Sequence, residues 1–194
     1  MLAQNYPYFT QKELNKIALK NPISKNRILD YEKHIQKFNS LTKEEQLKRV
    51  NAYLNRLQAQ YDDITQNKED SWATPKEFLE LGYGDCEDYV LIKYYSLIRL
   101  GFDEKKLFIT IVKEKFRGGT HMVLSYFKTP LHSPLILDNL SFKILSLDTR
   151  VDLQAEYFIN STGVYKLDNN LHLKKIADKF KEFEEIRVKV SKKI

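Results

Sequence analysis

Residues 74–102 read TPKEFLELGYGDCEDYVLIKYYSLIRLGF, and they predict two consecutive helices joined by a short turn. The Thr-Pro-Lys-Glu run at 74–77 has an N-capping threonine, a first-turn proline and a glutamate that can close a capping box. Gly82 is expected to end this first helix, since glycine readily adopts the left-handed conformation found after helix C-termini. Asp85 then has the side chain of an N-cap, and the apolar run behind it predicts a longer helix over residues 86–100.

Outward from this stretch, helical patterns precede it and strand patterns follow it. We therefore expect an α+β fold in which a helical N-terminal half packs on an antiparallel β-sheet. One domain is expected over residues 1–194, with a helical lobe over about 1–101, a strand-rich lobe over about 102–170 and a C-terminal helix over about 172–190. The other expected helices cover about 10–20, 24–38 and 42–61, and the expected strands cover 107–112, 121–127, 135–137, 142–147 and 164–167.

The composition excludes several classes of protein. With 194 residues, of which 42% are hydrophobic, the chain can bury a core, and its apolar runs are far shorter than the roughly 20 residues of a membrane span. The 32 lysines and arginines outnumber the 26 acidic residues, but the two signs are mixed along the chain and no glycine-rich phosphate loop accompanies them. We therefore expect no nucleic-acid partner and no membrane span.

The first residues, MLAQNYPYF, lack a charged segment followed by an apolar one, so no signal peptide is expected in this sequence. The pattern fits a cytoplasmic protein, and it equally fits a mature chain from which a leader has been removed. Composition does not decide between the two.

The chain has one cysteine, Cys86, directly after the expected N-cap Asp85. A single cysteine excludes an intramolecular disulfide and a cysteine-rich zinc site. At the first position of a helix, free amide N–H groups and the helix dipole stabilise a thiolate, which suits a nucleophile. A lone cysteine in a globular chain is more often a small buried hydrophobic residue, so the cysteine alone leaves both interpretations open.

Three carboxylates flank this thiol: Asp85, Glu87 and Asp88. Their charges would raise the pKa of Cys86 and oppose thiolate formation. Acidic residues in a first helical turn also complement the helix dipole, which gives them a purely structural explanation. Alternatively, they provide the hard oxygen ligands that Ca²⁺ prefers, and a bound Ca²⁺ would cancel the repulsion.

A thiol nucleophile needs a base, and the base needs an orienting group. His121 is the one histidine that begins an apolar strand run, HMVLSYF. Asp138 follows the next strand run, PLILDN, and adjacent strands would place its carboxylate beside the imidazole. Asp148 and Asp168, farther along the chain, compete for this role. The remaining histidines lie in polar segments or turns: His34, His132 and His172.

The order of these motifs resembles the bacterial transglutaminase-like cysteine proteinase family. The resemblance is carried by GDCEDY at 84–89, HMVLSYF at 121–127 and PLILDNL at 134–140. It extends upstream to RVNAYLN at 49–55 and downstream through SLDTR at 146–150. Because these motifs occur in one order, they form a more specific signature than any of them alone.

The resemblance implies a papain-like or transglutaminase-like core with a Cys-His-Asp triad. In that triad Cys86 is the nucleophile, His121 the base and Asp138 the orienting group. The resemblance also implies calcium dependence through Asp85 and Glu87. Asp88 is a further candidate ligand.

The same resemblance implies a biological role. Family members act in the periplasm, where they cleave a large repeat-containing surface adhesin near its N-terminus, at a pair of small residues, and release cells from biofilm. They are restrained by the periplasmic domain of an inner-membrane receptor that responds to cyclic-di-GMP. The expected activity is calcium-dependent hydrolysis of a peptide bond through an acyl-enzyme. Two alternatives remain: a transglutaminase-type acyl transferase, in which an amine attacks the thioester, and a non-catalytic binding module on the same fold.

Three further residues lie in the matched region or beside it. Asn51 and Asn55 are interpreted as helix positions that tie loops together. Trp72 is interpreted as a packing residue, with a place in the substrate cleft or near the oxyanion as the alternative.

Overall fold

The computed structural model describes residues 5–59, 72–116, 118–130, 132–168 and 172–192. Helices dominate the first half of the chain and strands the second, as expected. The helices are α1 (Gln11–Lys20), α2 (Pro22–Phe38), α3 (Lys43–Leu54), α4 (Pro75–Leu81), α5 (Cys86–Arg99) and α6 (Lys181–Ser191), with 3-10 turns η3 (Glu104–Lys106) and η4 (Leu147–Thr149). The strands are β1 (Gln58–Ala59), β2 (Tyr83–Gly84), β3 (Leu107–Glu114), β4 (Thr120–Tyr126), β5 (Leu135–Leu137), β6 (Leu145–Ser146), β7 (Leu153–Asn160), β8 (Gly163–Leu167) and β9 (Leu173–Ala177).

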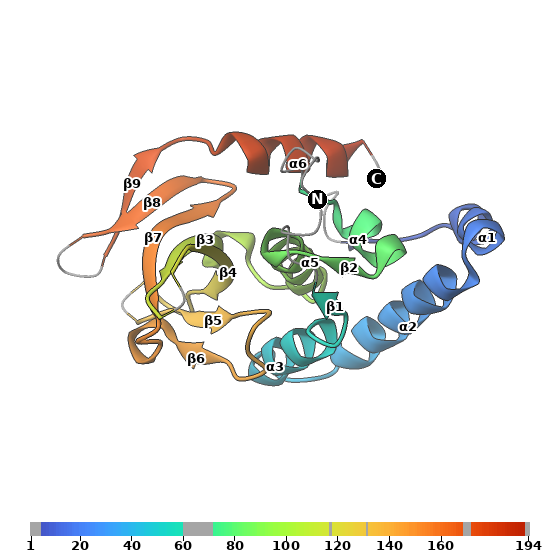
Figure 1. Ribbon diagram of the computed structural model, residues 1–194, viewed down its shortest axis with the longest axis horizontal. Coiled ribbons are helices and arrows are strands. Elements are labelled where there is room, and N and C mark those ends of the chain that lie inside the picture. The colour runs from blue at the N-terminus through green and yellow to red at the C-terminus, as the bar shows by residue number, and fades with distance from the viewer. Residues whose placement is uncertain (1–4, 60–71, 117, 131, 169–171, 193–194) are drawn as a thin grey trace.

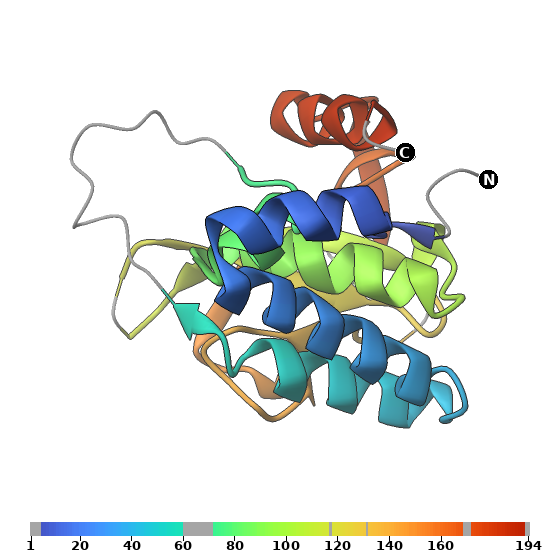
Figure 2. The same ribbon diagram turned by 90° about the vertical axis from the view of Figure 1, so that its right-hand side faces the viewer.

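Most of the strands form one antiparallel sheet in the order β6-β5-β4-β3-β7-β8-β9, and β1 pairs with β2 in a separate parallel ribbon. Helix α5 lies between this sheet and the N-terminal helices (Figure 1). The view turned by 90° shows α1 and α2 in front of α5, with α3 below it (Figure 2). This is the expected α+β architecture, a helical layer packed on an antiparallel sheet.

Helix α5 is the centre of the molecule, and its sequence explains why. From Tyr89 to Ile98 its side chains are apolar or aromatic apart from Lys93 and Ser96, so this part is stable only when other elements cover it all round. Its residues are buried continuously from Glu87 to Ile98. Asp85 caps its N-terminus by accepting a hydrogen bond from the backbone N–H of Asp88, as the sequence predicted. The cap and the burial together fix the position of Cys86 at the first residue of the helix.

Local start and stop signals are confirmed in the neighbouring helices. Thr10, Thr42 and Thr74 each cap a helix by accepting the backbone N–H of the glutamate three residues later. Gly82 follows α4 with a φ of 83°, the left-handed conformation expected of a C-terminal glycine.

Two expectations about helix length are wrong. The expected helix over about 172–190 begins only at Lys181, because residues Leu173–Ala177 form strand β9 on β8 and extend the strand-rich lobe beyond residue 170. The expected helix over 42–61 ends at Leu54, after which the backbone of Gln58 pairs with Tyr83. The far end of that expected helix, from residue 60, lies outside the described residues. In both places, pairing with another strand prevails over the helical spacing of apolar residues: β9 pairs with the preceding strand β8, and β1 pairs with β2, which lies farther along the chain.

Two strand expectations also need correction. The strand expected over 142–147 is reduced to Leu145–Ser146, which pairs with β5 at the edge of the sheet. The sequence did not predict β7, although this strand pairs with both β3 and β8 in the middle of the sheet.

One hydrophobic cluster joins the helices to the sheet. It contains fully buried residues from α3 and α5 as well as from β3, β4 and β5, among them Leu54, Leu91, Ile109, Leu124 and Leu137. In the described ranges, no helix combines the length and the hydropathy that crossing a bilayer requires.

Candidate active site

The thiol of Cys86 lies at the junction of α5 and β4. Cys86 is the first residue of α5 and is half-buried. Helix α5 packs on β4, and the backbone of Met122 makes a hydrogen bond to the thiol that favours its ionised form. Because Met122 directly follows His121, the thiol lies beside the part of the strand that carries the expected base.

His121 and Asp138 are in direct contact. His121 Nε2 lies 2.9 Å from Asp138 Oδ1, and the two residues are only 8% and 1% exposed. The antiparallel pairing of β4 with β5 brings them together, since Asp138 directly follows β5. With Nε2 bonded to the carboxylate, Nδ1 is the ring nitrogen that remains for proton exchange with a thiol.

The competing residues lie elsewhere. Asp148 and Asp168 are exposed, and Asp168 accepts a hydrogen bond from the backbone of His172. His34 stacks on Tyr53, with 4.3 Å between ring centres, and His132 Nδ1 bonds to Thr129. Of the candidates considered from the sequence, only Asp138 meets His121.

Asp138 is held as a carboxylate. Burial opposes its ionisation, but hydrogen bonds from His121, the backbone N–H of Leu140 and Arg150 hold the pKa of Asp138 below its usual range. Arg150 Nη2 donates to Asp138 Oδ2 at 2.9 Å and also bonds to Asp152. The sequence reasoning did not assign a role to Arg150, although the residue lies in the SLDTR run that carried part of the resemblance.

The loop that carries Asp138 is fastened to α3. Asn55 Nδ2 donates to the backbone oxygens of Asp138 at 2.7 Å and of Ser141 at 2.9 Å. Asn51 Nδ2 donates to the same Ser141 oxygen at 2.8 Å. The expectation that these asparagines tie loops together is therefore confirmed.

The carboxylates beside the thiol have unequal surroundings. The Cys86 thiol donates to Glu87 Oε2 at 3.1 Å. Burial, and next the charge of Glu87, raises the pKa of Cys86 well above its usual range. Burial, and next the negative charge of Asp85, raises the pKa of Glu87 to about 8. Asp88 faces another way, since its Oδ1 accepts the backbone N–H of Ala73 at 2.7 Å.

Asp85 and Glu87 are the residues here that fit a hard cation. They are close enough for the charge of Asp85 to disfavour ionisation of buried Glu87, and a divalent cation would relieve this repulsion. Asp88 fits less well, because one of its oxygens is already bonded to the backbone. Within the described ranges, no group of three or more histidine, cysteine, aspartate or glutamate side chains converges as a ready-made metal site.

Trp72 is a packing residue in this structure. It is 8% exposed and stacks on Phe180, with 6.1 Å between ring centres. This contact joins the segment before α4 to the residue that precedes α6.

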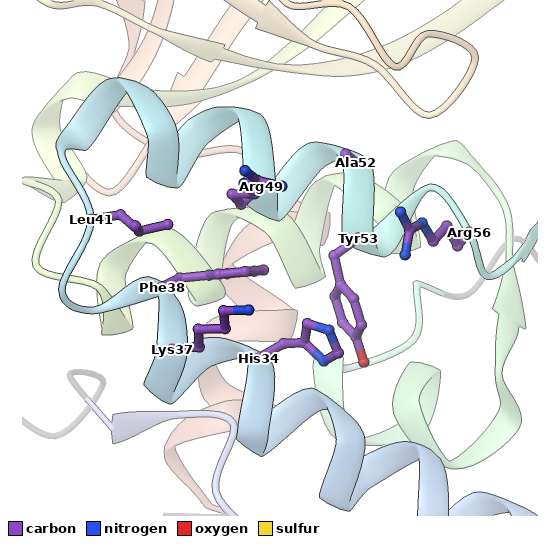
Figure 3. Close-up of a pocket in the computed structure, with 8 residues that line it drawn as sticks. All are labelled: His34, Lys37, Phe38, Leu41, Arg49, Ala52, Tyr53 and Arg56. Atoms are coloured by element: carbon purple, nitrogen blue, oxygen red, sulfur yellow. The ribbon is translucent and has the colours of Figure 1, made fainter.

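A separate pocket lies between α2 and α3 (Figure 3). Basic and aromatic side chains from both helices line its cavity of about 220 Å³. On α3 these residues lie on the side of the helix opposite Asn51 and Asn55, so the pocket faces away from the Asp138 loop. Its lining consists of His34, Lys37, Phe38, Leu41, Arg49, Ala52, Tyr53 and Arg56.

Comparisons with known proteins agree with this geometry. The family model of the bacterial transglutaminase-like cysteine proteinases matches residues 28–156. The calcium-bound structure of LapG from Legionella pneumophila is similar with a TM-score of 0.77 and 30% identity over 93% of this chain and 99% of that one. A second LapG structure from the same organism has a TM-score of 0.79 and 30% identity, and the match covers 96% of this chain and 99% of that one. An EGTA-treated LapG structure has a TM-score of 0.80 and 29% identity, with 95% and 99% of the two chains covered. No curated protein matches the chain. The chain belongs to the bacterial transglutaminase-like cysteine proteinase family and is a cysteine protease of that kind.

Proposed function

We propose that this protein is a calcium-dependent cysteine endopeptidase with Cys86 as nucleophile, His121 as general base and Asp138 as orienting group. The observation that carries the proposal is the 2.9 Å hydrogen bond between His121 Nε2 and Asp138 Oδ1, next to a thiol at a helix N-terminus. Thiol, imidazole and carboxylate are the three chemical groups that an acyl-enzyme mechanism needs.

In the proposed reaction, His121 Nδ1 takes the proton of the Cys86 thiol, and the thiolate attacks the carbonyl carbon of the scissile peptide bond. The backbone N–H of Cys86 has no acceptor within the helix, because it belongs to the first turn, and it donates to the developing oxyanion. His121 then gives its proton to the leaving amine as the C–N bond breaks. A water molecule, deprotonated by His121, hydrolyses the thioester and restores the thiol.

Asp85 and Glu87 are the proposed ligands of Ca²⁺, with Asp88 as a weaker candidate because of its bond to Ala73. When bound, the cation supplies positive charge that offsets the carboxylates beside the thiol. Glu87 would then no longer hold the thiol proton, and the pKa of Cys86 would fall toward the range in which His121 can deprotonate it. The calcium-bound LapG structure supports this part of the proposal.

The proposed substrate is the N-terminal region of a large repeat-containing surface adhesin, cut at a pair of small residues to control attachment in biofilm. The proposed location is the periplasm, and the proposed regulator is the periplasmic domain of an inner-membrane receptor that responds to cyclic-di-GMP. Similarity to LapG over nearly the full length of both chains supports these assignments. We also propose that residues 1–194 act as one cysteine-proteinase domain, because one hydrophobic cluster joins both halves.

The test uses the purified protein and its Cys86→Ala variant with N-terminal adhesin fragments, in Ca²⁺ and in a strong chelator, with the products identified by mass spectrometry. The wild-type protein should cut only in Ca²⁺, and the variant should not cut at all. Cleavage by the variant would refute the assignment of the nucleophile. An added primary amine that appears in the product would instead indicate acyl transfer.

A further inference from the structure

Helix α5 carries a fully buried lysine on the same face as Cys86. Lys93 lies two helical turns beyond Cys86, which is about 10 Å along the axis. Lys93 is 0% exposed, and its Nζ has no hydrogen-bond partner in the part of the chain that the structure describes. A buried amine without partners is costly, so the surroundings of this one should contain groups that compensate it.

Three buried acceptors without donors lie at the loop that carries Asp138. They are the side-chain oxygens of Asn51, Asn55 and Asn139, unpaired among the described residues. The first two asparagines already donate their amide nitrogens to this loop, and the third belongs to it. Lys93 contacts the ring of Tyr89, whose hydroxyl bonds to the backbone just beyond α3, so the lysine lies on the side of α5 toward the end of α3, where this loop is fastened.

The charged and titratable groups around Lys93 come from several elements. Tyr89 of α5 lies with its ring centre 5.7 Å from Nζ, and its hydroxyl donates to the backbone of Leu57 just beyond α3. Asp138, in the loop after β5, is near enough for its charge to act on Lys93, and its carboxylate is shared with His121 and Arg150. Burial lowers the pKa of Lys93 to about 7, while the charge of Asp138 raises it. The ammonium form therefore depends on this carboxylate and on hydrogen-bond acceptors.

We propose that Lys93 is a positioning residue for the Cys86 site, an inference that rests on the proposed roles of His121 and Asp138. Its ammonium group donates through ordered water to the free amide oxygens of the three asparagines and so fastens loop 138–141 to α5 as well as to α3. Buried polar sites with several partners commonly retain such water. Lys93 thereby keeps the Asp138 carboxylate at hydrogen-bond distance from His121.

The test needs no substrate, because Cys86 is the single cysteine and its alkylation by iodoacetamide reports on one thiol. Lys93→Met keeps the length of the side chain and removes its charge and donors. Because Lys93 Nζ has no direct hydrogen-bond partner among the described residues, the variant also removes the cost of burying an unpaired amine, and the melting temperature should change little. Alkylation of Cys86 at neutral pH in saturating Ca²⁺ should nevertheless slow about tenfold, because loop 138–141, which carries Asp138, loses its hydrogen bonds to α5. The NMR signal of the His121 Nε2 proton should broaden through faster exchange.

Lys76→Met is the matched control, because Lys76 is also a buried lysine, and its Nζ bonds to Glu13 of α1 at 2.8 Å. This variant should lower the melting temperature and leave the alkylation rate of Cys86 and the NMR signal of the His121 Nε2 proton unchanged. Asn139→Ala should slow alkylation as Lys93→Met does, and the double variant should be no slower than either, because both act through one network.

Asp138→Asn separates this inference from the proposed function. If Cys86 in Asp138→Asn is alkylated at the wild-type rate, the triad assignment itself is overturned. If Cys86 is alkylated slowly in Asp138→Asn but at the wild-type rate in Lys93→Met, only the role of Lys93 is overturned. If Lys93→Met does not fold, the alkylation rate of Asn139→Ala takes its place: a slow rate supports the network of Lys93 and the asparagines, and a wild-type rate overturns it.

Discussion

Arg150 and His121 share the carboxylate of Asp138 by taking opposite oxygens: Arg150 Nη2 lies 2.9 Å from Oδ2, and His121 Nε2 lies 2.9 Å from Oδ1. The backbone N–H of Leu140 adds a second donor to Oδ1. A carboxylate that is 1% exposed is thus surrounded by donors that fix its orientation as well as its charge. The imidazole accordingly meets a partner that cannot rotate freely.

This arrangement predicts that Arg150→Met damages both stability and the site. Removing the guanidinium leaves Asp138 Oδ2 buried without that donor, at a cost of about 3–5 kcal/mol for breaking a buried ion pair. We expect a lower melting temperature and at least tenfold slower alkylation of Cys86. Arg99→Met is the control, since Arg99 bonds to Glu32 and to the backbone of Pro7 away from the site. Equal effects of the two variants on alkylation would contradict a specific role for Arg150.

The low pKa of Asp138 predicts the acid sensitivity of the fold. Because the folded-state pKa lies below the ordinary value of 3.8, the folded protein binds fewer protons here than the unfolded chain. The stability that this carboxylate contributes is therefore present above about pH 4 and is lost as the pH falls below that value. Melting temperatures between pH 6 and pH 2 should fall less steeply for Asp138→Asn than for the wild type. Asp148→Asn is the comparison. Hydrogen bonds from Ser146 and Ser133 also lower the pKa of Asp148, but this residue is exposed, so its replacement should flatten the profile less, and an equal flattening would refute the assignment.

The sequence predicted the surroundings of Cys86 well because the relevant signals are local. A helix cap needs only residues within one turn, so Thr74 and Asp85 could be recognised from neighbours in the chain. The pairing of His121 with Asp138 could also be anticipated, since the two follow one another on adjacent antiparallel strands.

The rest of the site depends on contacts that local patterns do not encode. Arg150 reaches Asp138 from the turn after η4, and nothing in its immediate neighbours marks it as a partner of a buried carboxylate. Strand β9 has apolar residues at helical spacing, and only its pairing with β8 makes it a strand. Lys93 looks like one polar residue in an apolar helix until burial on every side is known.

Gly84 should not tolerate a side chain, and the reason is space. A Cβ at this position would lie 2.6 Å from Asp88 Oδ2 and 2.9 Å from the ring of Phe78. Gly84→Ala must therefore push aside the first turn of α5, which carries Cys86. We expect a loss of about 1–3 kcal/mol in the free energy of unfolding, measured in urea, together with slower alkylation of the thiol. Gly118→Asn is the comparison, because its surroundings are open and asparagine tolerates its φ of 75°. Unchanged stability of Gly84→Ala would show that the helix start can shift without cost.

Glu87 predicts how calcium and pH act together on stability. Its pKa is about 8 in the folded protein without metal, against an ordinary value of 4.5, so the folded state binds more protons than the unfolded chain between these values. The stability associated with protonated Glu87 is thus fully present below about pH 4 and is lost as the pH rises through 8. In chelator, the melting temperature of the wild type should fall across this range, and that of Glu87→Gln should change much less. Added Ca²⁺ at pH 8 should raise the melting temperature of the wild type, because a cation between Asp85 and Glu87 favours the ionised carboxylates that high pH produces. The same rise in Glu87→Gln would mean that calcium stabilises the protein at another place, and Glu87 would then have to be removed from the proposed ligands.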